Sequence, residues 1–375
     1  SVYLFLCILL SVYLLTDIGF HKWHGSHLTP HLLGVSLNLS ETNLLCNSLQ
    51  DGCDSYHRHP PLYFYINYLI SHFSWSADTY VKHAMTASII FNYVGVFALM
   101  QIYGGDKTEK FFVILFTTSS LLFVVNLTLS SYDSLIILMF AMYAVSEKYD
   151  LNRTAYIAIF ISVILSWYFV LAGTLYTLYR FYRGNYQAIF PYTAGLIITI
   201  TFLMNDSEKL YENFTAATEN IDFSPNANSQ RQLDLPNTIR MLIVNLVYTM
   251  SPVGLLIGGF GLMKPKNLIK TLAKRSTFIY FPLLVFLIWN TIFFRWSLIH
   301  NFVYLMLIPF LIPIYLEILR TLSSKIKLLI IFISLATIFQ IHKTVIQGYD
   351  NLSNYTNEGV EIFMEATHRD GNPDN

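Results

Sequence analysis

The stretch that decides the fold covers residues 241–294 and reads "MLIVNLVYTMSPVGLLIGGFGLMKPKNLIKTLAKRSTFIYFPLLVFLIWNTIFF". Two apolar segments, 241–263 and 277–294, flank the basic turn 264–275. Each segment has about the length that a helix needs to cross a bilayer. Because Lys and Arg accumulate in cytoplasmic loops, the stretch predicts two antiparallel membrane spans joined by a cytoplasmic turn.

The same kind of apolar segment recurs along the whole chain. Further examples are 84–103, 111–129, 186–204, 298–316 and 327–342. Of the 375 residues, 54% are hydrophobic and 12% are charged, whereas soluble domains carry roughly 25% charged residues. The composition therefore predicts a polytopic membrane protein with the lipid bilayer as its main solvent. The formal net charge of zero gives no basis for nucleic acid as a partner.

The basic turns predict the topology. Besides 264–275, they are "GGDKTEK" (104–110), "SEKYDLNR" (146–153), "YRFYRGN" (179–185) and "RTLSSKIK" (320–327). All five fall on one side if the apolar segments alternate in direction. We expect an all-α bundle of about eleven spans over residues 1–342, beginning with a first span within 2–15. Loops 16–80 and 205–238 and the polar tail 343–375 would then be extracytoplasmic.

The first extracytoplasmic loop is long enough to carry function. It contains Asp17, immediately after the first span, and "DSYHRHPPLYFYINYLI" (54–70). Pro60 and Pro61 can start a helix, because the missing N–H groups would be unpaired in the first turn anyway. The following residues, 62–73, are too few and too polar for a confident crossing, so we expect a helix in the membrane interface with its aromatic side chains at headgroup depth.

Two further patterns in this loop concern a disulfide and a metal site. Cys46 and Cys53, in "CNSLQDGC", are expected to form a disulfide in an oxidising compartment; two free thiols are the alternative. His21, His24 and His27 recur at helical spacing, and imidazole is a zinc ligand. Gly25 interrupts that pattern, and surface histidines beside acidic lipid explain it equally well.

Several segments together resemble the GT-C superfamily of membrane glycosyltransferases, and within it the type that includes protein O-mannosyltransferases and lipid A aminoarabinose transferases. The resemblance begins with Asp17 and the "HPPLYFYINYLI" element. It continues in "ADTYVKHAMTASIIFNYVGVFALMQIYGG" (77–105), "NLTLSSYDSLIILMFAMYAVSEK" (126–148) and "FRWSLIHNFVYLMLIPFLIPIYLEIL" (294–319). It covers roughly residues 1–150 and 290–320.

The resemblance implies transfer of a sugar from a polyprenyl-phosphate donor to an extracytoplasmic acceptor, with inversion at the anomeric carbon. Such a reaction needs a base for the acceptor hydroxyl and positive charge for the departing phosphate. Asp17 is the candidate base and Asp133 the second catalytic candidate, although Asp17 also fits an ordinary interfacial carboxylate and Asp133 a helix cap. The candidates for binding the donor phosphate are Arg58, His59, Lys82 and Arg295, and for Arg295 an interface anchor is the alternative.

The cofactor, the location and the general function class follow from the same interpretation. The resemblance implies no cofactor with certainty; a divalent ion between the donor phosphate and the carboxylates is one arrangement, which some GT-C relatives use. We expect the inner (plasma) membrane of a bacterium, or the ER membrane in a eukaryote, with the site on the extracytoplasmic face. A polysaccharide polymerase or ligase acting on lipid-linked oligosaccharide is an alternative enzyme, and a transporter or flippase for a lipid-linked sugar is the non-enzyme alternative.

Overall fold

The computed structural model describes residues 60–128, 132–203, 235–262, 277–299 and 301–347, together with Ile8 and Ser11. Within these ranges the chain is entirely helical. The elements are α4 (Leu62–His72), α5 (Ala77–Tyr103), α6 (Lys107–Thr118), α7 (Leu121–Leu127), η1 (Tyr132–Leu135), α8 (Ile136–Lys148), α9 (Asn152–Leu165), α10 (Trp167–Tyr182), η2 (Tyr186–Ala188), α11 (Ile189–Leu203), α13 (Leu235–Leu262), η4 (Thr277–Tyr280), α15 (Phe281–Ile292), α16 (Phe294–Ile299), η5 (Asn301–Met306), α17 (Leu307–Thr321) and α18 (Ser324–Gln347).

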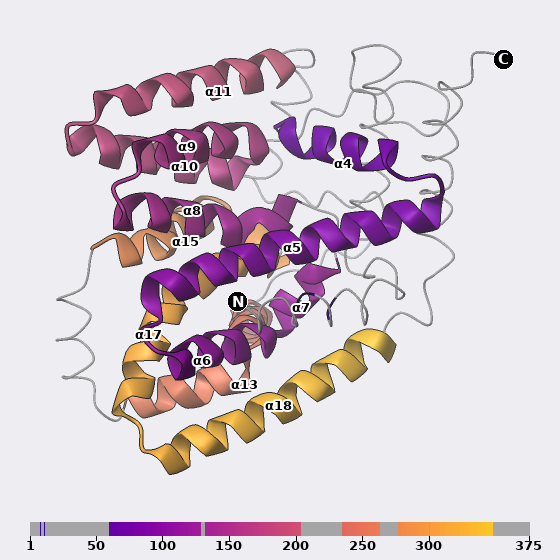
Figure 1. Cartoon of the computed structure of the whole chain (residues 1–375), viewed down its shortest axis with the longest axis vertical. Coiled ribbons are helices and arrows are strands. Elements are labelled where there is room, and N and C mark those ends of the chain that lie inside the picture. Colours follow the sequence, from indigo (N-terminus) through magenta and orange to yellow (C-terminus); the bar gives the residue numbers. More distant parts are fainter. Residues whose placement is uncertain are drawn as a thin grey trace.

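The long helices stack as an antiparallel bundle (Figure 1). Among the described residues, four stretches are long and apolar enough to cross a bilayer: Thr79–Tyr103, Pro236–Gly261, Phe302–Thr321 and Ser324–Ile341. The bent pair α6 and α7 would make a fifth, and shorter apolar helices lie between them. Every apolar segment predicted from residue 84 onward corresponds to a helix or to a bent helix pair. The polytopic helix bundle predicted from the sequence is therefore confirmed.

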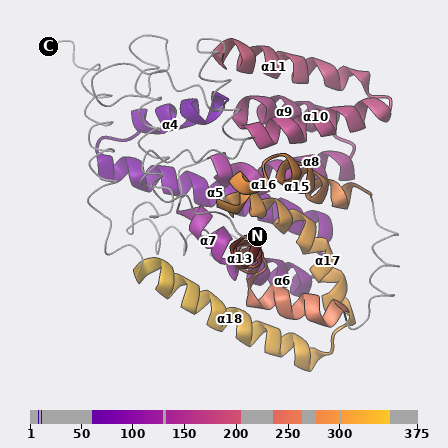
Figure 2. The same cartoon turned by 180° about the vertical axis from the view of Figure 1, so that it is seen from behind.

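Four of the five basic turns lie along one edge of the bundle. These are the turns that join α5 to α6, α8 to α9, α10 to η2 and α17 to α18, and they share the left edge of Figure 1 and the right edge of the reversed view in Figure 2. This is the arrangement that the alternating direction of the spans requires. The fifth basic turn, 264–275, lies outside the described residues.

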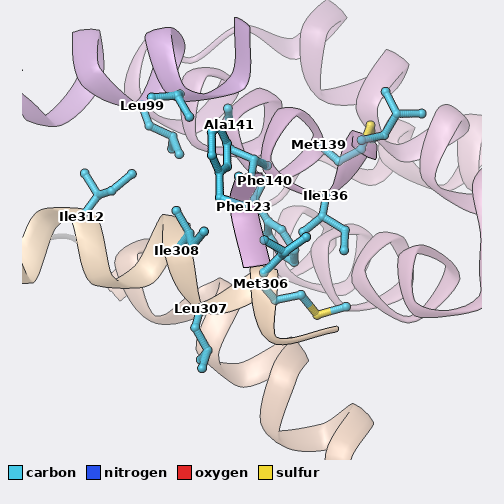
Figure 3. Packing of buried hydrophobic residues seen from close by; sticks show 14 of the residues in the cluster. Leu99, Phe123, Ile136, Met139, Phe140, Ala141, Met306, Leu307, Ile308 and Ile312 are labelled. Carbon is cyan, nitrogen blue, oxygen red and sulfur yellow. The ribbon is translucent and has the colours of Figure 1, made fainter. Parts of the chain in front are cut away.

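The core lies where α5, α7, α8 and α17 meet. Figure 3 shows Phe123 of α7 and Phe140 of α8 packed among aliphatic side chains, with Ile308 of α17 close by. Gly95 of α5 lies directly against α8: a Cβ atom there would be 2.6 Å from the backbone N of Leu138. Small residues permit this close approach of two membrane helices, so Gly95 sets the spacing between α5 and α8.

Two segments predicted as continuous spans are broken instead. The apolar segment 111–129 is divided into α6 and α7, which are bent by 78°. Its residues 117–120 read "TTSS", and the hydroxyls of Thr117 and Ser119 donate to the carbonyl oxygens of Val113 and Phe116. Hydroxyls that bond to the backbone in this way compete with the helix ladder and bend it.

The segment 241–263 is also interrupted, at Ser251 in α13. Ser251 has φ 61° and ψ 164° and precedes Pro252, and this conformation is otherwise almost restricted to glycine. The two breaks contact each other. The Ser119 and Ser251 hydroxyl oxygens are 3.1 Å apart, and the Ser120 hydroxyl donates to the Tyr248 carbonyl at 3.0 Å.

Candidate functional site

Asp133 is a buried carboxylate at the start of α8. It lies in η1, and 5% of its surface is exposed. A carboxylate in such a place needs hydrogen-bond donors to offset the loss of water. The Tyr168 hydroxyl donates to Asp133 Oδ1 at 2.6 Å, a length typical of a hydrogen bond from a hydroxyl to a charged oxygen. The N-cap position of α8 is occupied by Leu135, so Asp133 does not hold the cap position that the alternative interpretation gave it.

A second set of hydrogen bonds holds the backbone at Asp133. The side-chain amide of Asn126 in α7 donates to the Asp133 carbonyl at 3.3 Å and to Asn92 Oδ1 at 3.1 Å. Ser88, one turn before Asn92 on α5, donates its hydroxyl to the Asn126 carbonyl at 3.0 Å. Because Asn92 and Asn126 are fully buried, these bonds are shielded from water and fix η1 against two helices.

Tyr168, the donor to Asp133, belongs to a series of aromatic rings in contact with one another. Tyr132 lies between Tyr63 of α4 and Tyr168 of α10, with ring centroids 6.2 Å and 5.8 Å away. Trp289 of α15 stands edge-on to Tyr168 at 5.7 Å. Edge-to-face rings at such distances stabilise one another. Rings from α4, η1, α10 and α15 are thus connected through Tyr132, which adjoins Asp133 in the sequence, and Tyr168, which donates to it.

The "HPPL" element reaches this place through α4. Pro60 and Pro61 are buried, and Pro61 occupies the N-cap position of α4, as the predicted helix start requires. The Tyr80 hydroxyl donates to Asn67 Oδ1 at 2.9 Å, and the Ser74 hydroxyl lies 2.9 Å from His83 Nδ1. These contacts fasten α4 to α5.

The opposite face of α4 is exposed and apolar. Tyr65, Leu69 and Phe73 recur every four residues with 49%, 58% and 69% of their surfaces exposed. Residues at this spacing share one face of a helix. An exposed aromatic stripe of this kind is what a helix lying in the membrane interface needs, and the predicted helix over 62–73 is present as α4.

The remaining predicted site residues are distributed as follows. Lys82 is half-buried on α5, and Arg295 belongs to α16. Among the described residues there is no group of three or more His, Cys, Asp or Glu that would hold a metal ion. Eight predicted site residues lie outside the described residues: Asp17, His21, His24, His27, Cys46, Cys53, Arg58 and His59. Residues 204–234 and the tail from 348 also lie outside them.

Sequence reasoning missed Tyr168, Asn92 and Asn126. Nothing in "SWYF" distinguishes Tyr168 from the many other tyrosines of the chain. The asparagines gave a usable signal, because an amide inside an apolar span is costly unless it is paired. Chemically, Asp133 offers a fixed carboxylate that can accept a hydrogen bond from a hydroxyl group.

Comparison with known proteins supports the fold. No family model and no curated protein matches the sequence. Among solved structures, the crystal structure of ArnT from Cupriavidus metallidurans bound to undecaprenyl phosphate matches with a TM-score of 0.54. The match covers 98% of this chain and 77% of that one, at 11% sequence identity. The chain shares its fold with ArnT.

The similarity agrees with the resemblance that the sequence motifs suggested. It extends over nearly the whole chain, whereas the motifs covered only roughly residues 1–150 and 290–320. At 11% identity the similarity establishes the architecture, while the chemistry has to be argued from the site.

Proposed function

We propose that the protein is an integral-membrane glycosyltransferase that moves a sugar from a polyprenyl-phosphate donor to an extracytoplasmic acceptor. The observation that carries the proposal is the position of Asp133: a desolvated, hydrogen-bonded carboxylate beside the "HPPL" helix α4, at the end of α8 opposite the basic turns. The fold shared with ArnT, a protein whose structure contains undecaprenyl phosphate, supports the class of donor.

The proposed reaction uses Asp133 together with candidates identified from the sequence. Asp17 takes the proton from the acceptor hydroxyl, whose oxygen attacks the anomeric carbon. The bond from that carbon to the phosphate oxygen breaks, and polyprenyl phosphate leaves with the electron pair. Asp133 accepts a hydrogen bond that orients the attacking hydroxyl. Attack from the face opposite the phosphate inverts the anomeric centre.

Basic residues stabilise the departing phosphate in this proposal. Arg58 and Arg295 offer planar forks that match phosphate oxygens, while His59 and Lys82 contribute single donors. Positive charge aimed at the leaving oxygen lowers the barrier most in a site that excludes water. Transfer measured with and without EDTA distinguishes these residues from a divalent cation as the counter-charge.

The decisive experiment measures transfer from a panel of radiolabelled polyprenyl-phosphate sugars in proteoliposomes. We expect transfer by the wild type, loss of transfer in Asp17→Asn, and a reduction of about 100-fold in Asp133→Asn, the size of loss that misplacement of a reacting group causes. Asp150→Asn is the matched control, because the Asp150 side chain is 91% exposed at the basic edge. Full activity in Asp133→Asn, or an equal loss in Asp150→Asn, would contradict the role of Asp133.

A flippase for a lipid-linked sugar is the second candidate, and the paired helix breaks favour it. Many transporters bind their substrate where two discontinuous helices meet, and the breaks of α6/α7 and α13 contact each other through Ser119 and Ser251. The same proteoliposomes test this function. Movement of a fluorescent polyprenyl-phosphate sugar between leaflets, without transfer to any acceptor, would identify a flippase.

A further inference from the structure

We propose that Tyr168 is a positioning residue that fixes the orientation of the Asp133 carboxylate for transfer; this inference rests on the proposed function. Tyr168 comes from α10, which neither the motifs nor the family resemblance connected with the site. Its hydroxyl is 2.6 Å from Asp133 Oδ1. Through this hydrogen bond the Tyr168 hydroxyl holds one oxygen of the carboxylate in place.

The Tyr168 ring cannot swing away from Asp133. Only 1% of its surface is exposed, and it packs against Tyr132, Phe169 and Trp289 at centroid distances of 5.8 Å, 4.7 Å and 5.7 Å. Rings from α10, α15 and η1 thus confine it from several sides. A donor held so rigidly restrains the carboxylate more strongly than an exposed side chain would.

The chain directions place Tyr168 at the right level of the bundle. α9 ends at Leu165, Ser166 forms the corner with an extended backbone (φ −165°, ψ 165°), and α10 begins at Trp167. Tyr168 therefore lies in the first turn after a corner, at the opposite end of α10 from the basic edge. η1 lies at the same end of α8. The geometry of the α9–α10 corner and the position of Asp133 are thus linked through one hydrogen bond.

The test replaces Tyr168 with Phe, which removes the hydroxyl and keeps the ring. We expect kcat to fall roughly 10- to 100-fold, as found when the hydrogen-bond partner that orients a functional side chain is removed. KM for the polyprenyl-phosphate sugar should stay within about twofold. kcat falls while KM is unchanged because the substitution leaves binding of the donor intact and removes only the orientation of the Asp133 carboxylate during transfer.

Tyr143→Phe is the matched control. Tyr143 is also fully buried, on α8, and its hydroxyl pairs with Ser162 rather than with Asp133. Loss of that hydroxyl leaves Asp133 untouched, so kcat should remain within about twofold of wild type. Equal losses in Tyr143→Phe and Tyr168→Phe would overturn the proposal, since they would show only the effect of losing a buried hydroxyl.

A double-mutant cycle separates positioning from support of the fold. In the Asp133→Asn background, Tyr168→Phe should lower kcat by no more than about twofold further, because the group that it positions is already gone. Multiplicative losses would overturn the proposal. If Tyr168→Phe is not recovered folded, Trp289→Leu takes its place: it loosens the Tyr168 ring, and the resulting loss in kcat should again disappear in Asp133→Asn. A loss that persists in that background overturns the proposal.

The failures of the two proposals are distinguishable. Absence of transfer by the wild type from every donor would refute the glycosyltransferase, and this inference with it. Transfer by the wild type with undiminished kcat in Tyr168→Phe would refute the role of Tyr168 alone.

Discussion

The contact between α5 and α8 predicts opposite effects for two substitutions of glycine by alanine. In Gly95→Ala the new Cβ would lie 2.6 Å from Leu138 N and 2.8 Å from two further backbone atoms of α8. Carbon atoms normally approach to about 3.5 Å or more, so the helices must separate by close to 1 Å. Backbone atoms cannot rotate away as the end of a side chain can, and the shift spreads along both helices.

The expected cost is worked from two opposing contributions. Overpacking in a tightly packed core costs typically 1–3 kcal/mol, and the contact with backbone places Gly95→Ala at the upper end. Alanine regains about 1 kcal/mol of helix propensity. We therefore expect Gly95→Ala to lower the free energy of unfolding by about 1–2 kcal/mol. It should also lower transfer, because η1 and Asp133 lie at one end of α8.

Gly259→Ala is the control for this prediction. Gly259 lies on α13, and a Cβ there would meet nothing within 4 Å. Only the propensity gain remains, so the substitution should stabilise the protein by roughly 0.5–1 kcal/mol. Thermal unfolding of both variants in the same detergent measures the difference. A Gly95→Ala protein at least as stable as Gly259→Ala would refute the close approach of α5 and α8.

Three further predictions concern backbone strain and ion pairs. Substituting Ser251 with Ala or with Gly removes the serine hydroxyl in both cases, but only Gly relieves the backbone strain. The free energy of unfolding of Ser251→Gly should therefore be about 1–3 kcal/mol higher than that of Ser251→Ala. Equal stabilities would contradict the strain. Arg180 donates to Glu147 at 2.8 Å and keeps Asn152 and Asp150 as partners, so Glu147→Ala should cost about 1.5–3 kcal/mol in thermal unfolding, and Arg180→Met in that background should restore part of it. Arg320 pairs with Glu109 at 2.7 Å near the surface, so Glu109→Ala should cost only about 1 kcal/mol or less, and a rise in salt should diminish that cost.

Much of the architecture could be predicted because it depends on solvent preference and charge. The pair α9 and α10 is an example. The basic turns at 146–153 and 179–185 were predicted to lie on one side of the membrane, and in the structure α9 and α10 lie between these turns and meet at Ser166. Span direction follows from which ends carry Lys and Arg, and that information is local in the sequence.

The broken helices were harder to predict because the apolar sequence continues through each break without interruption. Residues 111–129 have the hydropathy of a single span, and hydroxyl residues such as those of "TTSS" are compatible with membrane helices. The bend depends on Ser119 and Ser120 finding partners on α13. Those partners lie about 130 residues away, and nothing at residues 117–120 identifies them.

The candidate site shows the same division between local and distant information. Asp133 could be identified because it lies in the segment 126–148, which resembles the GT-C superfamily. Tyr168 was not, because its role depends on the corner at Ser166 and on packing against Trp289. A residue that acts through a contact between distant elements leaves no spacing pattern in the sequence.

The bend between α6 and α7 is also what brings the second support of Asp133 into place. Asn126 lies six residues beyond Ser120, or roughly 9 Å along a helix at 1.5 Å per residue. If α7 continued straight from α6 instead of turning by 78°, Asn126 would lie roughly 11 Å from its actual position by the same helical rise. Its amide could not then reach the Asp133 carbonyl, which it contacts at 3.3 Å. The cost of breaking a membrane helix is therefore offset at the site itself: the hydroxyls of Ser119 and Ser120 hold the bend against α13, and the bend delivers the amide that fixes η1.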